Sequence, residues 1–154
     1  MKQFKGRPVV AGKCTAPALV SHGGFNTLAS FQGALQFGDL PIIGKKYQHT
    51  ECDDQNNKDL YQKPMQDKAL CLPQTIGSTT GGMILYCAKA IGKCPSCLLF
   101  SEHIDSLAAA GAALGAVWSD NPMPVVDCLG QEFLDYVKDG MKITIDEDGT
   151  VTVE

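Results

Sequence analysis

The second half of the sequence alternates short apolar runs with segments of helical periodicity. The apolar runs span residues 69–72, 97–100 and 125–126, and the helical segments span residues 82–91, 107–114 and 130–139. Short apolar runs of this kind are typical of buried strands, and helices between such strands are typical of β-α-β units. Asp105 favours the start of the second helix, and Gly92 and Gly140 favour the ends of the first and third. This order predicts an α/β fold of central strands with flanking helices.

Strands near the start of the chain extend the predicted sheet. Residues 9–11 and 18–20 read as two short strands. Periodicity then fades, and about residues 44–66 form a long irregular insertion rich in polar residues. A loop longer than about 15 residues is uncommon inside a compact domain, so we expect this segment to be functional, to contact a partner or to be partly disordered. With 154 residues the chain suffices for a single domain, 1–154.

The chain closes with a predicted β-hairpin between residues 141 and 154. A two-residue turn would oppose apolar to polar side chains across the hairpin. A three-residue loop that ends on a left-handed Gly149 instead pairs Ile145 with Val151, and one face of the hairpin becomes apolar. The three-residue loop is therefore the preferred register.

Composition and charge exclude several classes of function. With 44% hydrophobic and 19% charged residues, the chain is typical of a globular protein rather than a disordered one. The net charge is −4, and neither a basic stripe nor an apolar run of about 20 residues supports binding to nucleic acid or insertion into a membrane. The odd number of cysteines, seven, and the lack of a signal peptide at the start indicate reduced thiols and a cytoplasmic protein.

The loop between the first buried strand and the first helix has the composition of an anion-binding turn. Ser78, Thr79 and Thr80 lie between Gly77 and Gly81, where a helix N-terminus presents unpaired N–H groups and a positive partial charge. Oriented N–H groups also stabilise an alkoxide, which would activate Ser78. An ordinary turn with a threonine N-cap explains the same residues, so both interpretations stay open. No lysine follows the glycines, so the loop is not a P-loop.

Cys94 and Cys97 form a C-x-x-C motif, which is typical of a redox pair or of half a metal site. Redox pairs usually sit at the start of a helix, whereas this pair runs directly into the strand 97–100. The remaining cysteines and His103 offer no second closely spaced pair of ligands, and we expect no metal site. Packing in the core is therefore the preferred role, and a non-catalytic thiol- or metal-responsive module is the alternative.

Acidic residues follow two of the predicted strands. Glu102 follows strand 97–100, and Asp105 begins the next helix. If neighbouring strands are parallel, their carboxyl ends share the edge where α/β sheets bind ligands, and Glu102 comes near Ser78. A solvated carboxylate and an aspartate N-cap also explain these residues, and from the residues alone this is the preferred interpretation. Asp127, at the end of strand 125–126, allows the same two interpretations.

Five segments occur in an order that is shared with a known family. They are Phe4-Lys5-Gly6-Arg7 with Gly12-Lys13, Gly77-Ser78-Thr79-Thr80-Gly81, Glu102 with Asp105, Pro124-Val125-Val126-Asp127, and Val137-Lys138-Asp139-Gly140. Through these segments and their order, the chain resembles the small subunit, or swivel domain, of the aconitase X family. The resemblance covers nearly the whole chain apart from about residues 44–66. It implies a swivelling β/β/α domain that closes over a large subunit carrying an iron–sulfur cluster.

The resemblance also implies a reaction and a set of site residues. In the family, the two subunits form a hydro-lyase that dehydrates a small hydroxy acid, and a swivel-domain serine removes the proton next to a carboxylate. That serine corresponds to Ser78, and the small subunit is expected to be inactive without its large partner. The other residues of the loop would bind the substrate: Gly77, Thr79, Thr80 and Gly81. Two acidic residues, Glu102 and Asp105, would support the site.

Two substrates are known for the family, cis-3-hydroxy-L-proline and mevalonate 5-phosphate. Many relatives carry an arginine just before the serine, whereas this chain has Gln74, Thr75 and Ile76 there. The missing basic residue favours a substrate without phosphate. We therefore expect dehydration of cis-3-hydroxy-L-proline to 1-pyrroline-2-carboxylate, with mevalonate 5-phosphate as the alternative substrate.

Overall fold

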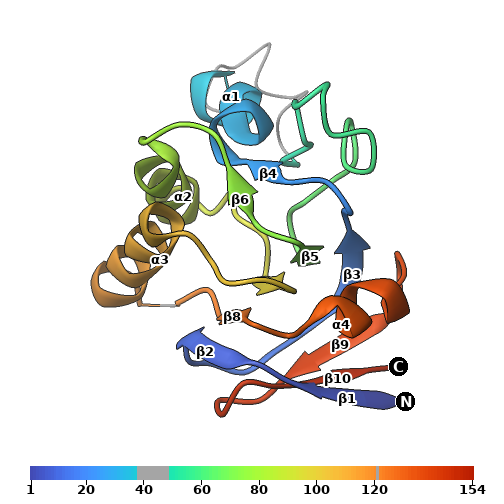
Figure 1. Cartoon of the computed structure of the whole chain (residues 1–154). Coiled ribbons are helices and arrows are strands. Elements are labelled where there is room, and N and C mark those ends of the chain that lie inside the picture. The colour runs from blue at the N-terminus through green and yellow to red at the C-terminus, as the bar shows by residue number, and fades with distance from the viewer. Residues whose placement is uncertain (38–48, 121) are drawn as a thin grey trace.

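A large curled sheet and a layer of helices make up most of the computed structural model, which describes residues 1–37, 49–120 and 122–154 (Figure 1). The strands of the large sheet are β1 (Lys2–Lys5), β2 (Arg7–Val10), β3 (Cys14–Val20), β5 (Ala69–Leu72), β7 (Cys97–Phe100), β8 (Val125–Asp127), β9 (Lys142–Ile145) and β10 (Thr150–Val153). Their order across the sheet is β1-β10-β9-β3-β5-β7-β8-β2. The prediction of an α/β fold with central strands is confirmed.

The four central strands run parallel to one another. β3 pairs with β5, β5 with β7, and β7 with β8, all in parallel. Every residue of β5 and β7 is buried, which is why both strands read as unbroken apolar runs. Because parallel strands end at the same edge, the segments that follow them, including Gly77–Gly81, lie along one edge of the sheet.

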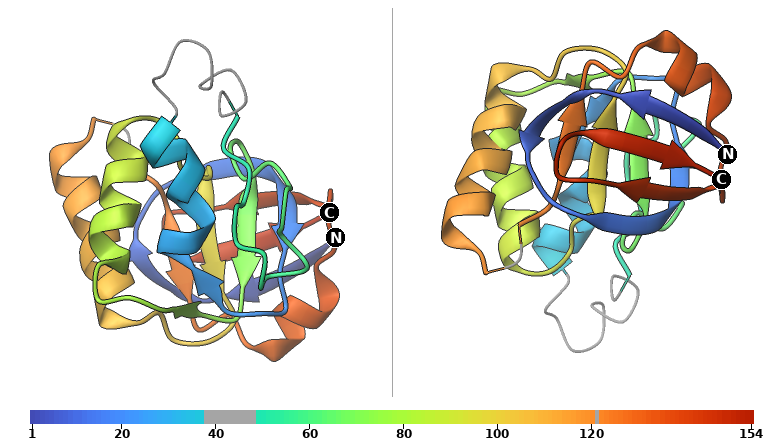
Figure 2. Two further views of the ribbon diagram at one scale, coloured as in Figure 1. Left: turned by 90° about the horizontal axis from the view of Figure 1, so that it is seen from above. Right: turned by 90° about the horizontal axis from the view of Figure 1, so that it is seen from below.

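The sheet curls until its two edge strands meet. β1 and β2 lie at opposite ends of the strand order, yet only Gly6 separates them in sequence. The N–H of Gly6 donates to the carbonyl of Gly149 at 3.0 Å, and a Cβ on Gly6 would come within 2.5 Å of the Asp127 carbonyl. Seen from below, the strands surround a common interior (Figure 2). A glycine is therefore needed where the two edges approach each other.

Side chains from the two faces of the central strands enter two separate cores. Leu70 and Leu98 belong to a helix-side core, which includes buried residues of α1, α2 and α3. Cys71, Cys97 and Leu99 belong to an inner core, which fills the curl of the sheet and includes α4. This alternation follows from the period of two in a β-strand. Both faces of the central strands are thereby covered.

Three helices lie against the helix-side core, and a short fourth one packs on the inner core (Figure 1). They are α1 (Thr27–Phe37), α2 (Gly81–Ala90), α3 (Ser106–Trp118) and α4 (Gln131–Tyr136). The predictions of α2 and α3 are confirmed, although α3 continues one turn further than expected. Within the described residues no helix is both long and apolar enough to cross a membrane.

The C-terminal hairpin has the predicted register. Ile145 pairs with Val151, and Gly149 is left-handed with φ = 83°. The predicted role of Gly140 is wrong, because α4 already ends at Tyr136. Gly140, with φ = 85°, instead lies in the turn that leads into β9, where its N–H donates to the carbonyl of Ala18 at 2.9 Å.

The irregular insertion predicted at 44–66 is described only from residue 49 onward, so residues 44–48 lie outside the described part. From residue 49 the chain stays irregular, with isolated β-bridges instead of strands. Cys52, Leu60 and Met65 nevertheless lie buried in the helix-side core. The described part of the insertion is therefore packed against the domain rather than loosely attached. Its apolar residues are too unevenly spaced to give a periodic signal.

Candidate active site

A small parallel sheet holds the start of the Ser78 loop. Its strands are β4 (Phe25–Asn26) and β6 (Thr75–Ile76), and Asn26 lies opposite Ile76. Gly77 follows with φ = 104°, and a Cβ there would lie 2.9 Å from the Asn26 side chain. Both the positive φ and the close approach require a glycine. The Asn26 side chain is itself fixed, because its Oδ1 accepts a hydrogen bond from the N–H of Ala29 at 3.1 Å.

Two groups of Thr80, its hydroxyl and its backbone N–H, lie within hydrogen-bond distance of the Ser78 hydroxyl. Ser78 Oγ lies 2.8 Å from Thr80 Oγ1, and the N–H of Thr80 donates to Ser78 Oγ at 3.2 Å. The carbonyl of Ser78 accepts from the N–H of Gly81 at 2.9 Å, which ties the residue to the first turn of α2. The side chain is exposed. This arrangement presents one hydroxyl to solvent beside the N-terminus of a helix.

The simple threonine N-cap does not describe this helix start. Thr80 occupies the N-cap position of α2, but its side chain makes no capping hydrogen bond. Its hydroxyl is directed to Ser78 instead. The N–H of Gly81 is taken by the Ser78 carbonyl, but the Thr80 side chain caps none of the first-turn N–H groups, so the positive end of α2 faces the loop without a threonine cap.

A cavity of about 270 Å³ lies between this loop and the start of α3. The loop contributes Gly77, Ser78 and Gly81 to its lining, and α3 contributes its first turn together with Asp105. Asp105 caps α3, because its Oδ1 accepts from the N–H of Leu107 at 2.8 Å. The predicted N-cap role of Asp105 is thus confirmed, and the same residue also lies at the cavity.

Two threonines that the sequence did not single out connect the walls of the cavity. Thr75 donates its hydroxyl hydrogen bond to Oδ2 of Asp105, which joins β6 to the start of α3. Thr27, at the start of α1, donates to the carbonyl of Gly81 at 3.3 Å. Both threonines line the cavity. Neither lies in a recognisable motif, so only the fold brings them to the site.

The remaining predicted site residues lie outside this lining. Thr79 and Thr80 are exposed and do not line the cavity. Glu102 is exposed as well, and its backbone N–H donates to the carbonyl of Pro73 at 3.1 Å. Although β5 and β7 are parallel as expected, the carboxylate that reaches the cavity is that of Asp105 and not that of Glu102. The chain turns between these two residues and brings only the second over the loop.

Asp127 has a structural role at the closure of the sheet. Its buried carboxylate pairs with Arg7 through two hydrogen bonds, at 2.9 Å from Nε and 2.6 Å from Nη2, and accepts from the N–H of Ile104 at 3.0 Å. Burial raises the pKa of Asp127, but these donors outweigh it and the pKa lies below its ordinary value. The pair joins β2 to β8 and leaves the carboxylate satisfied.

The C-x-x-C cysteines face different cores. Cys94 packs against the helix-side core, whereas Cys97 is buried in the inner core. The sheet therefore separates the two side chains, which argues against a redox pair between them. Among residues 1–37, 49–120 and 122–154, no group of three or more His, Cys, Asp or Glu side chains is placed to hold a metal ion.

Comparison with known proteins identifies the family. The aconitase X swivel domain family matches residues 3–153. The chain belongs to this family. Its curated relatives include the phosphomevalonate dehydratase small subunits of Methanocella arvoryzae, with 28% identity over 94% of this chain and 92% of the relative, and of Aeropyrum pernix, with 26% identity over 98% and 92%.

A solved structure of an aconitase X protein shares the fold. The crystal structure of Thermococcus kodakaraensis aconitase X (holo-form) superposes with a TM-score of 0.79 at 22% sequence identity, covering 100% of this chain and 99% of the other. The predicted fold, with its C-terminal hairpin, is confirmed by this match. The family implies an iron–sulfur cluster in the large subunit, and the described residues of this chain gather no ligand set that would fit one.

Proposed function

We propose that this chain is the small subunit of a phosphomevalonate dehydratase, which removes water from mevalonate 5-phosphate. The proposal is supported by the family and by the curated relatives, which carry that name and align over more than nine tenths of both chains. It replaces the expected substrate cis-3-hydroxy-L-proline, for which the comparisons offer no specific support. The missing arginine before Ser78 does not exclude a phosphorylated substrate, because a phosphate-binding group can come from another part of the assembly.

Ser78 is the proposed base that removes the proton from the substrate carbon. A serine hydroxyl acts as a base only when its alkoxide is stabilised. The Thr80 N–H and hydroxyl both lie within hydrogen-bond distance of Ser78 Oγ, beside the open N-terminus of α2. The Thr80 N–H donates to this exposed oxygen, and the Thr80 hydroxyl is placed to donate to it once Ser78 is ionised; this contact is the observation that carries the assignment.

The backbone of the loop is the proposed binding surface for the substrate carboxylate. Gly77 and Gly81 line the cavity of about 270 Å³ next to Ser78, and the positive end of α2 favours an anion there. Thr75 and Asp105 would hold the opposite wall in position. An iron–sulfur cluster in the large subunit would supply a Lewis acid to the substrate.

Ser78 is exposed in this chain, so water has free access to it. A stabilised alkoxide needs a site from which water is excluded. We therefore propose that the large subunit covers the loop and that neither subunit is active alone. We place the pair in the cytoplasm, where the cysteines of the chain are kept reduced.

The experiment is to co-express the chain with its large subunit and to follow loss of water from both candidate substrates. We expect turnover of mevalonate 5-phosphate and none of cis-3-hydroxy-L-proline, and no turnover by either subunit alone. Turnover of cis-3-hydroxy-L-proline alone would overturn the substrate assignment but would leave the family assignment standing. Turnover of mevalonate 5-phosphate by the large subunit without this chain would remove the proposed role of the chain.

A further inference from the structure

Helix α3 is apolar on its solvent side as well as on its buried side. Its buried positions are small residues that contact α2 or the helix-side core: Ala108, Gly111, Ala112 and Gly115. Its solvent side carries apolar residues at helical spacing, which we call the α3 face: Leu107, Ala110, Leu114, Val117 and Trp118. The helix contains no charged residue. A surface helix normally has a polar outer side, and a helix that is apolar all round is normally covered all round.

The large side chains of the α3 face are accessible in this chain. Val117 is 75% exposed and Trp118 is 66% exposed, although the Trp118 ring packs edge to face against Tyr86 of α2 with centroids 5.9 Å apart. Figure 2 shows α3, α2 and α1 side by side in this order, with α3 at the outside of the helix layer. Monomeric proteins rarely expose contiguous apolar patches of more than a few hundred Å², and larger patches mark protein interfaces.

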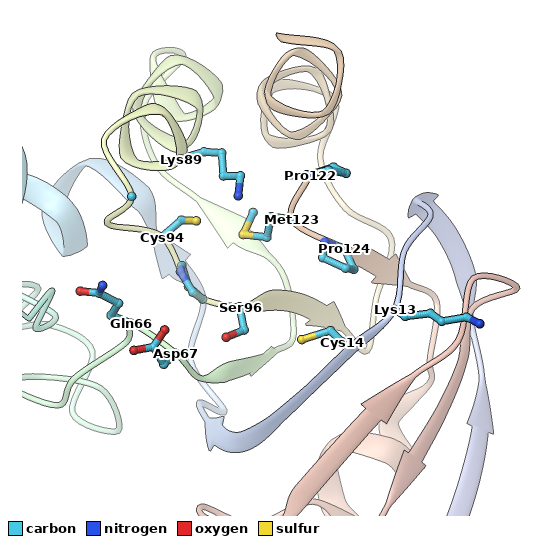
Figure 3. Close-up of a pocket in the computed structure, with 12 residues that line it drawn as sticks. Lys13, Cys14, Gln66, Asp67, Lys89, Cys94, Ser96, Pro122, Met123 and Pro124 are labelled. Atoms are coloured by element: carbon cyan, nitrogen blue, oxygen red, sulfur yellow. The ribbon is translucent and has the colours of Figure 1, made fainter. Parts of the chain in front are cut away.

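The one charged side chain of α2 and α3 lies away from the α3 face. It is that of Lys89, whose Cγ would lie 3.5 Å from a Cβ on Gly115, at the buried side of α3. Figure 3 shows the Lys89 side chain pointing into a cavity of about 370 Å³ that Ser96 also lines, at the amino ends of the parallel strands. The α3 face therefore offers a partner apolar contacts without a charge from either helix.

The α3 face begins at the cavity beside Ser78. Leu107 belongs to both, because it lines that cavity and is the first residue of the α3 face. Ile76 lines the same cavity and is 50% exposed, and Met83 in the first turn of α2 is 59% exposed. The first turns of the two helices touch, since a Cβ on Gly82 would collide with the carbonyl oxygen of Leu107. Apolar side chains thus extend from the rim of the cavity along α3, whose 13 residues span about 20 Å.

We propose that the α3 face, together with Ile76 and Met83, is the docking surface for the large subunit. This inference rests on the proposed function, in which the large subunit covers the Ser78 loop. The loop 77–81 alone is too small to hold a partner, since specific interfaces use about 20–30 residues from each side. The surface that adjoins the loop is apolar, as in permanent complexes. A second copy of this chain on the α3 face would contact Leu107 and obstruct the cavity that the large subunit must close.

The first test uses Trp118, which is the single tryptophan of the chain and reports on the α3 face without any substitution. The chain is labelled with fluorotryptophan, unlabelled large subunit is added, and the fluorine NMR signal is recorded in H₂O and in D₂O. We expect the solvent isotope shift of this signal to be largely lost when the pair forms, because the partner excludes water. An unchanged isotope shift in a pair that elutes together on size exclusion would overturn the proposal.

The second test places a charge on the α3 face with Leu114→Glu and uses Tyr61→Glu as the matched control. The two side chains are 41% and 38% exposed, and Tyr61 belongs to the insertion, which lies on the opposite side of α1 from α3 (Figures 1 and 2). Leucine and glutamate have similar helix propensities, so Leu114→Glu should fold normally, which circular dichroism checks. We expect Leu114→Glu to raise the Kd of the two subunits by about 30-fold or more, and Tyr61→Glu to change it by less than about 3-fold.

The outcomes separate this inference from the proposed function. A raised Kd for Leu114→Glu in a pair that dehydrates neither candidate substrate would support the docking surface and refute the proposed function. An unchanged Kd in a pair that dehydrates mevalonate 5-phosphate would refute the docking surface alone. Self-association of the isolated chain that Leu114→Glu abolishes, with an unchanged Kd for the large subunit, would assign the α3 face to a second copy and overturn the proposal.

Discussion

The contact between α2 and α3 predicts how glycine-to-alanine substitutions in α3 change the free energy of unfolding. Whether a substitution stabilises or destabilises depends on how closely α2 approaches that glycine. The two helices touch backbone to backbone where Gly82 lies against Gly111. A Cβ on Gly111 would fall well under 3.0 Å from the Gly82 carbonyl, closer than real Cβ atoms approach other atoms. At Gly115, on the same helix, the nearest atom to an added Cβ is Cγ of Lys89 at 3.5 Å, which is an ordinary contact with a flexible side chain.

The same substitution should therefore have opposite effects at the two positions. Alanine is about 1 kcal/mol better than glycine inside a helix, so Gly115→Ala should raise the free energy of unfolding by up to about 1 kcal/mol. At Gly111 that gain is opposed by overpacking, which typically costs about 1–3 kcal/mol. We expect the upper end of this range, because a backbone carbonyl cannot rotate away. The net loss for Gly111→Ala is then about 2 kcal/mol.

The two variants should thus differ by about 3 kcal/mol in the free energy of unfolding. For a chain of this size, 1 kcal/mol corresponds to about 2–4 °C, so Gly111→Ala should melt about 6–12 °C below Gly115→Ala. Thermal and urea unfolding of the isolated chain, followed by circular dichroism, measures the difference. If Gly111→Ala were as stable as Gly115→Ala, the close crossing of the two helices would be refuted.

Three further predictions concern single side chains. In the two-subunit enzyme, Thr80→Val should lower kcat by about 10–100-fold because one donor to the proposed base is lost, whereas Thr79→Val should change kcat much less. Asp105→Ala should lower the free energy of urea unfolding by about 1–3 kcal/mol through loss of a helix cap, and Asp105→Asn, which keeps a capping oxygen, should lose less. A hydrogen bond from Lys5 lowers the pKa of Asp148 to about 2. The ionised Asp148 therefore contributes to stability above its unfolded pKa of about 3.9, and this contribution is lost as the pH falls through 2. Lys5→Met should raise the pKa of Asp148 in an NMR titration.

The two central strands were predicted from sequence because their burial is continuous. β5 and β7 are covered on both faces, so they appear as unbroken apolar runs. Helix α1 was missed because its buried side includes Thr27, Ser30 and Gly33, which leave no apolar stripe. Strand β1 was missed because Phe4 is its only buried residue. Such elements are specified by long-range packing rather than by a local pattern.

The surroundings of the candidate site could be predicted only in part, for a similar reason. Ser78 lies in a local motif of glycines and hydroxyls at a helix start, which a sequence displays directly. The choice between Glu102 and Asp105 depended on the path of the chain after β7, and no local pattern encodes that path. Thr27 and Thr75 reach the cavity only through the pairing of β4 with β6 and the packing of α1. A pattern of residues therefore located the loop, and the fold supplied its neighbours.

The most direct test of the account is the kcat of Ser78→Ala in the assembled two-subunit enzyme with mevalonate 5-phosphate. Ser96→Ala, at the opposite edge of the sheet, is the matched control. Loss of a general base typically costs about 100–10,000-fold, so we predict a fall of that size in kcat with little change in KM and an unchanged Ser96→Ala enzyme. Turnover by Ser78→Ala at the unmodified rate would contradict the assignment of Ser78 as the base.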